Sequence, residues 1–142
     1  MGKKTWIDSD IWTDTEDLTV QERLLYLCLL TNNQRNIAGY YKLNIDHLSL
    51  DVGLAKQKIE SMLIRQKKYW IYDKETRQVL IPKFTKHNTV KSSPQVIKLN
   101  AELRTLKPCP LHKEFLKAFT ECNGIGAETV LDAKFVEIAK SY

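Results

Sequence analysis

Three polar side chains near the start of one predicted helix have the types and the spacing that can read DNA bases. Lys56 and Gln57 are adjacent, and Ser61 follows one helical turn later. A glutamine amide can bond both polar atoms on the edge of an adenine, a lysine can donate to guanine, and a serine can bond a base or a phosphate. The alternative is that all three are solvated residues of an amphipathic helix. We predict that they contact DNA bases.

Further basic side chains extend this set toward the phosphate backbone of DNA. Lysine and arginine contacts to phosphates orient a protein on DNA without reading its sequence. Lys74 and Arg77 flank the tip of a predicted β-hairpin, where a charged side chain serves either a phosphate contact or solubility. The other predicted contacts of this kind are Lys58, Arg65, Lys67, Lys68 and Lys86.

The distribution of charge also favours a polyanionic partner. The chain has 142 residues and a formal net charge of +5. Residues 52–113 hold 14 basic and 4 acidic side chains, whereas the segments before and after them are net acidic. A field of one sign over one part of a small protein attracts nucleic acid. A solvated lysine-rich face is the alternative explanation of the same charges.

No motif in the sequence predicts an enzyme or a metal site. Cys109 and His112 have the spacing of half a zinc site, but together with His87 and Cys122 they match no zinc module. The acidic residues between Asp8 and Asp17 lack the lysine or histidine motif that would accompany nuclease chemistry. We therefore expect a protein that is not an enzyme and that has no cofactor.

The cysteines and the hydropathy predict a cytoplasmic protein outside the membrane. Three cysteines without a close pair favour reduced thiols over a disulfide framework. No run of eighteen apolar residues and no secretory signal is present. Cys28 falls on the apolar face of a predicted helix and is expected to be buried, whereas Cys109 lies between two prolines and is expected to be accessible.

The predicted elements that position the basic residues begin with a helix. Thr19 and Glu22 have the spacing of a capping box, and apolar residues at helical spacing continue to residue 30. A short strand over residues 40–43, a helix over 45–52 that ends at Gly53, and a helix over about 54–67 follow. Residues 69–72 and 79–84 predict a β-hairpin, and Pro82 predicts that its second strand lies at a sheet edge.

The rest of the chain predicts further helices. Ser93 is expected to cap a helix that has Pro94 at its first position and reaches Leu106. Two prolines end this helix, and helices over residues 111–122 and 127–139 follow. We predict a domain over residues 1–106 and a helical extension over 107–142 that either packs on the first helix or serves as an interaction element. Trp6 and Trp12, with Ile7 and Ile11 between them, are expected to cover the first helix; anchoring a protein interface is the alternative.

The order of these elements is typical of a winged helix-turn-helix, which is a mainly α fold with a small β-hairpin. In that fold the last core helix enters the major groove, and the hairpin reaches the DNA backbone or the minor groove beside it. The helix over residues 54–67 would be the recognition helix, and the hairpin over residues 69–84 would be the wing.

Short motifs add a resemblance to a known family. The motifs are Ile7-Asp8-Ser9-Asp10-Ile11-Trp12, Leu24-Leu25-Tyr26-Leu27, and Val79-Leu80-Ile81-Pro82-Lys83-Phe84 followed by Lys86-His87. Over roughly residues 5–95 the chain resembles the N-terminal domain of replisome organisers, the replication initiation proteins of phages and prophages of Gram-positive bacteria, which are similar to DnaD-type primosome proteins. The resemblance implies a winged-helix fold, binding to origin DNA, and recruitment of a helicase loader or helicase.

Two other functions remain open at the level of sequence. A winged-helix transcriptional repressor would need a dimer that places two recognition helices about one turn of DNA apart. A protein-interaction module of the primosome would use the same fold without binding DNA. The expected partners are double-stranded DNA, a helicase loader or helicase, and further copies of the chain in a homodimer or higher oligomer.

Overall fold

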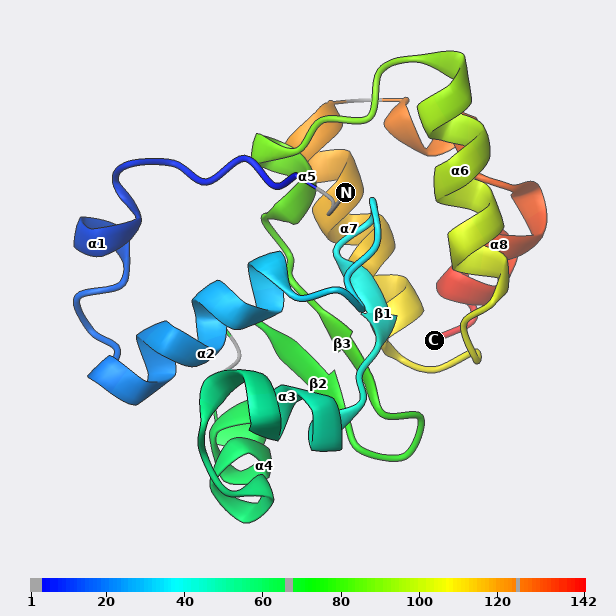
Figure 1. Ribbon diagram of the computed structural model, residues 1–142. Helices are drawn as coiled ribbons and strands as arrows, with labels where there is room; N and C mark the ends of the chain where they lie inside the picture. The colour runs from blue at the N-terminus through cyan, green and yellow to red at the C-terminus, as the bar shows by residue number, and fades with distance from the viewer. Residues whose placement is uncertain (1–3, 66–67, 125) are drawn as a thin grey trace.

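The computed structural model describes residues 4–65, 68–124 and 126–142, and its elements are mainly helical around a small antiparallel sheet (Figure 1). Position 67, one of the predicted phosphate contacts, lies outside the described residues. The elements are α1 (Ile11–Asp14), α2 (Val20–Thr31), β1 (Tyr40–Lys42), α3 (Ile45–Val52), α4 (Lys56–Arg65), β2 (Ile71–Asp73), β3 (Gln78–Leu80), α5 (Phe84–His87), α6 (Ser93–Arg104), α7 (Leu111–Asn123), the 3-10 helix η1 (Ala127–Val130) and α8 (Ala133–Lys140).

The three strands form a sheet with the order β1-β3-β2, and both pairings are antiparallel. The prediction that the second hairpin strand lies at an edge was therefore wrong, because β3 is the central strand. Pro82 falls beyond the end of β3 and removes no hydrogen bond from the ladder. Residues 82–87 leave the sheet and turn into the short helix α5, which the sequence patterns did not predict.

Local signals in the sequence start and end several helices as predicted. The Thr19 hydroxyl accepts from the Glu22 amide and the Glu22 carboxylate accepts from the Thr19 amide, so the capping box of α2 is complete. Gly53 ends α3 in the left-handed conformation at φ 76°. The cap of α6 is Ser92 rather than Ser93, because Ser92 pairs reciprocally with Gln95.

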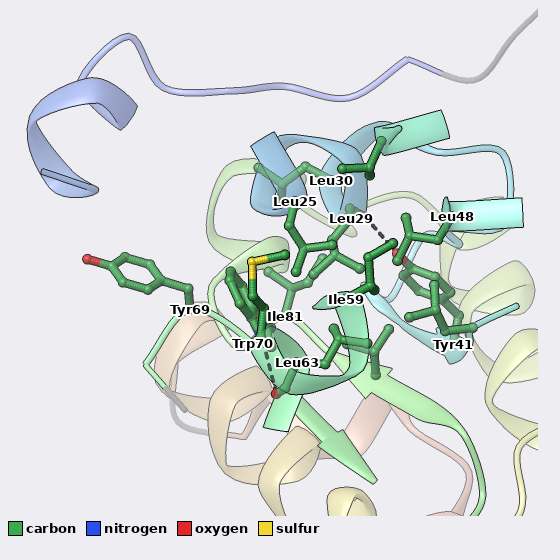
Figure 2. Close-up of a cluster of buried hydrophobic side chains, with 14 of the residues drawn as sticks. Leu25, Leu29, Leu30, Tyr41, Leu48, Ile59, Leu63, Tyr69, Trp70 and Ile81 are labelled. Carbon is green, nitrogen blue, oxygen red and sulfur yellow. Dashed lines mark hydrogen bonds between the residues drawn. The ribbon is translucent and has the colours of Figure 1, made fainter. Parts of the chain in front are cut away.

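The two faces of the sheet pack against different groups of helices. Side chains alternate along a strand, so Tyr41 and Val79 point to one face while Tyr40 and Leu80 point to the other. Tyr41 and Val79 join buried residues of α2, α3 and α4 in a first cluster, which Figure 2 shows in close-up. The Trp70 indole N–H donates to the carbonyl oxygen of Leu63 at 3.1 Å within this cluster.

The second cluster joins the other face of the sheet to α6, α7 and α8. The rings of Tyr40 and Phe115 are stacked with centroids 5.7 Å apart, and Phe115 in turn contacts Phe119 and Phe135. The C-terminal helices therefore pack on the sheet and not on α2, which was one of the two alternatives predicted for them. The single helix predicted over residues 127–139 is divided into η1 and α8.

In residues 4–14, here called the N-terminal arm, Ile11 packs against the first cluster, but Trp6 and Trp12 do not cover α2 as predicted. The Trp6 and Trp12 side chains are both outside the core, with 76% and 59% of each residue exposed. The Trp6 backbone is instead held by the side chain of Asn88, which is far from it in the sequence. The amide of Trp6 donates to Asn88 Oδ1 at 2.7 Å, and Asn88 Nδ2 donates to the Trp6 carbonyl oxygen at 3.1 Å. The arm thus runs from α5 to α1 before it joins α2 (Figure 1).

The cysteines differ from the predicted pattern at one position. Cys109 is buried rather than accessible, because the 107–110 segment lies against the sheet and places its sulfur 3.2 Å from the Tyr40 hydroxyl. The same hydroxyl lies 2.7 Å from Nδ1 of His112. Cys28 is half-buried beside the first cluster, and burial raises the pKa of its thiol to about 11.

No helix in the described part of the chain is both long enough and apolar enough to cross a membrane.

Candidate nucleic-acid interface

The polar face of α4 is positioned by three buried side chains. Ile59, Met62 and Leu63 are buried in the first cluster. Their burial fixes the rotation of α4 about its axis and keeps its polar side toward solvent. The exposed residues of the helix include the ones that the sequence assigned to DNA bases and to phosphates, as well as Ile64. The assigned ones are Lys56, Gln57, Lys58, Ser61 and Arg65.

A groove of about 720 Å³ separates the first turn of α4 from the β2–β3 turn. Three of the predicted contacts, Lys56, Lys74 and Arg77, line this groove together although they come from two different elements. Lys42, at the end of β1, lines it as well. Sequence reasoning missed Lys42 because only the pairing of β1 with β3 brings residue 42 opposite residue 78, at the base of the turn.

Hydrogen bonds fix the shape of the β2–β3 turn. The Asp73 carboxylate accepts from the backbone amide of Thr76 at 3.0 Å and from its hydroxyl at 2.5 Å. Arg77 then adopts φ 57°, the left-handed conformation that closes the turn, and its carbonyl accepts from the Leu43 amide at 2.8 Å. The backbone of the turn is therefore held to β1, while the Lys74 and Arg77 side chains stay exposed.

The charges that line the groove are mainly positive. Four cationic side chains, Lys42, Lys56, Lys74 and Arg77, face two anionic ones, Asp46 and Glu60, which leaves an excess of two positive charges. Lys56 Nζ lies 2.5 Å from Asp46 Oδ1. The hydrogen bond and the charge of Lys56 lower the pKa of that carboxyl below its usual value. Such a groove attracts an anion, and part of the attraction is already used by Asp46.

The remaining predicted contacts do not join this groove. Arg65 Nη2 lies 3.4 Å from Glu22 Oε2 of α2, and Lys68 Nζ lies 3.9 Å from Asp17 Oδ2. Lys86 belongs to α5. Figure 1 shows α5 and the start of the arm at one end of the molecule, with α4 and the β2–β3 turn at the other. Of the predicted set, Lys56, Lys74 and Arg77 line the groove and Lys68 and Lys86 lie near the arm, whereas Gln57, Lys58, Ser61 and Arg65 are exposed on α4 outside both.

Comparison with protein families, with curated proteins and with solved structures finds no match for this chain. Within the described residues, no group of three or more histidine, cysteine or acidic side chains could hold a metal ion. Cys109 and His112, the residues with the spacing of half a zinc site, both lie within hydrogen-bond distance of the buried hydroxyl of Tyr40.

Proposed function

We propose that this protein binds double-stranded DNA without catalysing a reaction on it. The observation that carries the proposal is the basic groove between the first turn of α4 and the β2–β3 turn; Gln57, Lys58 and Ser61 are exposed on the same helix, outside the lining of the groove. The order α2, β1, α3, α4, β2 and β3 supports assigning a winged helix-turn-helix, with α4 as recognition helix and the β2–β3 turn as wing.

The two halves of this surface have different tasks. Gln57 and Ser61 stand on the exposed side of α4 and are suited to reading base edges in the major groove. Lys42, Lys74 and Arg77 stand on the sheet and the turn, where they are suited to contacting phosphates and positioning the helix. Arg65 and Lys68, held near acidic residues, would add only a weak attraction for the backbone.

The resemblance to replisome organisers supports a specific role for the DNA complex. We propose that the protein acts in the cytoplasm in the initiation of phage DNA replication, where it binds origin DNA and helps to assemble a replisome with a helicase loader or helicase. A transcriptional repressor is the alternative within the class of DNA-binding proteins. Footprinting on phage genomic DNA distinguishes these roles, because an initiator protects the replication origin and a repressor protects promoters.

The DNA-binding proposal is tested by comparing one variant in α4 with one in the turn. On the duplex sequence selected by the wild-type protein, Gln57→Ala should weaken binding by about 1 to 3 kcal/mol, and on random duplex by much less. Arg77→Ala should weaken binding to all duplexes alike and reduce the slope of log affinity against log salt by about one unit. Both arginine and alanine carry a Cβ, so the strain at φ 57° is similar for the two residues and the turn should keep its conformation.

A matched control is Lys98→Ala, which removes an exposed lysine of α6 that does not line the groove. Its affinity for duplex DNA should equal that of the wild type. An equal loss on all sequences for Gln57→Ala would reject base reading by α4. No measurable duplex binding by the wild type at about 50 mM salt would reject the proposal itself.

One observation favours a protein-interaction module as the second candidate function. Four large apolar side chains stand exposed on three helices: Val20 and Leu24 on α2, Leu50 on α3, and Ile64 on α4. Large exposed apolar side chains that form a contiguous patch mark protein contacts. If duplex binding fails while Leu50→Glu and Ile64→Glu abolish self-association, this second function replaces the first.

A further inference from the structure

A second cavity lies beneath the N-terminal arm, away from the groove described above. Its volume is about 320 Å³, and its lining comes from the arm, α2, α5 and residues 68–69. The apolar part of the lining is made by Ile7, Ile11, Leu30 and Phe84, and its large aromatic side chains are Trp6, Tyr26 and Tyr69. The cavity is at the lower end of the size range in which proteins hold small ligands.

The cavity has a firmly attached roof. Besides the two hydrogen bonds between Trp6 and Asn88, Arg35 Nη2 donates to the carbonyl oxygen of Lys4 at 2.5 Å. At the other end of the arm the Tyr69 hydroxyl donates to the Asp14 carbonyl at 2.8 Å and to the Asp17 carboxylate. Tyr69 lies at the edge of the first cluster in Figure 2, and its ring centroid is 5.4 Å from that of Tyr26 and 6.4 Å from that of Trp70. These attachments hold the arm over the cavity at both ends.

The attachments hold the Trp6 backbone in place and leave its indole ring exposed. A large aromatic ring is usually buried, and its exposure is informative when it stands at the mouth of a cavity. Trp12 is exposed on the same arm but does not line the cavity. Of the two exposed tryptophans of the arm, only Trp6 is therefore placed to contact a ligand in the cavity.

Three lysines surround this aromatic mouth. Lys83 and Lys86 make no ion pair with any described residue, and Lys68 stands 5.1 Å from the centre of the Tyr69 ring. The carboxylates in the lining are Asp8 and Asp14, so the cations of the lining exceed them by one. Lys68 also pairs at 3.9 Å with Asp17 outside the lining, which leaves Lys83 and Lys86 as the lysines for a phosphate. Aromatic faces beside lysines are the combination with which proteins hold unpaired nucleotides, since the rings stack on bases and the cations attract phosphates.

We propose that the cavity under the arm binds an unpaired nucleotide of a single-stranded nucleic acid, with the Trp6 ring stacked on the base and Lys83 and Lys86 beside the phosphates. A paired base has both faces covered by its neighbours in the duplex and cannot enter. The site therefore differs in ligand from the groove at α4 and does not depend on it. A protein with both sites would hold duplex and single strand at opposite ends.

The experiment measures binding of a fluorescent oligothymidylate of about 12 nucleotides by anisotropy. Trp6→Ala should lower its affinity by at least about fivefold, because stacking of one base on an aromatic ring contributes this much or more. Trp6→Phe should restore most of the loss. Trp12→Ala is the matched control, and it should bind as the wild type does. Duplex affinity should be unchanged in Trp6→Ala.

The lysines give a second, independent readout. Lys83→Ala and Lys86→Ala should each reduce the salt slope of single-strand binding by about 0.7, and the Lys98→Ala control should not change it. An oligouridylate of the same length distinguishes RNA from DNA as the source of the nucleotide. Equal affinities of the Trp6→Ala and Trp12→Ala variants, or no binding of either oligonucleotide at about 50 mM salt, would overturn the proposal.

Discussion

Replacing Gly39 with alanine should destabilise the protein far more than the same replacement at Gly53. Both glycines have positive φ, 67° and 76° respectively, where an alanine costs about 1 to 2 kcal/mol. A Cβ at Gly53 would meet no atom within 4 Å. A Cβ at Gly39 would lie 2.3 Å from Cβ of Phe84 and 2.4 Å from its Cγ. Phe84 is buried in the first cluster and cannot move aside freely.

The expected magnitudes follow from these distances. Alanine stabilises relative to glycine by about 0.4 to 1 kcal/mol through the unfolded chain, so Gly53→Ala should cost roughly 1 kcal/mol or less. Gly39→Ala adds a steric overlap in a packed core, which costs about 1 to 3 kcal/mol more. The total for Gly39→Ala should be about 1 to 4 kcal/mol, a large part of the stability of a domain of this size.

Urea unfolding followed by tryptophan fluorescence measures both variants, since Trp70 is fully buried and reports the loss of the first cluster. Gly39→Ala should also loosen the arm, because the Gly39 carbonyl accepts from Ile81 just before α5, and α5 ends beside Asn88. If the two variants unfold at the same urea concentration, the close approach of Gly39 to Phe84 is refuted.

Three further outcomes are expected. Asp46→Asn removes the carboxylate that pairs with Lys56, and duplex affinity should rise by about threefold with a steeper salt slope, as a salt titration would show. Burial lowers the pKa of His112 below its usual 6.5, so the unfolded chain takes up a proton first as the pH falls. The free energy of unfolding should therefore be largest above about pH 6.5 and decrease below it, and urea titrations of His112→Gln should show a weaker decrease. In native thiol labelling followed by mass spectrometry, Cys109 should react more slowly than the half-buried Cys122; fast reaction of Cys109 would contradict its place against the sheet.

Much of the secondary structure could be predicted from residues close together in the sequence. The capping box of α2 joins residues three positions apart, and Gly53 ends α3 through its own conformational freedom. The buried side of α4 follows from the spacing of Ile59, Met62 and Leu63. These features depend on hydrogen bonds and rotations within one or two helical turns, so local residue types are sufficient to determine them.

Sequence patterns also identified part of the candidate interface. Lys56, Lys74 and Arg77 were selected by their charge and by their places at a helix start and a hairpin tip, and the structure brings them to one groove. The patterns could not show that Lys42 lines this groove or that Lys86 lies away from it. Their positions relative to the groove depend on the β1–β3 pairing and on where α5 leaves the sheet.

What only the tertiary structure decided are contacts between distant residues. Trp6 meets Asn88 across 82 positions, Tyr40 meets Cys109 across 69, and β3 enters the middle of the sheet because β1 pairs with it from the far side. Cys109 is buried and Trp6 is exposed, although the residue types and their neighbours predicted the opposite for each. Burial at such positions depends on which surfaces the folded chain brings together, and many arrangements of the same local elements bury similar apolar area. The local sequence therefore determined the elements and their capping, whereas packing across the sheet determined which side chains meet.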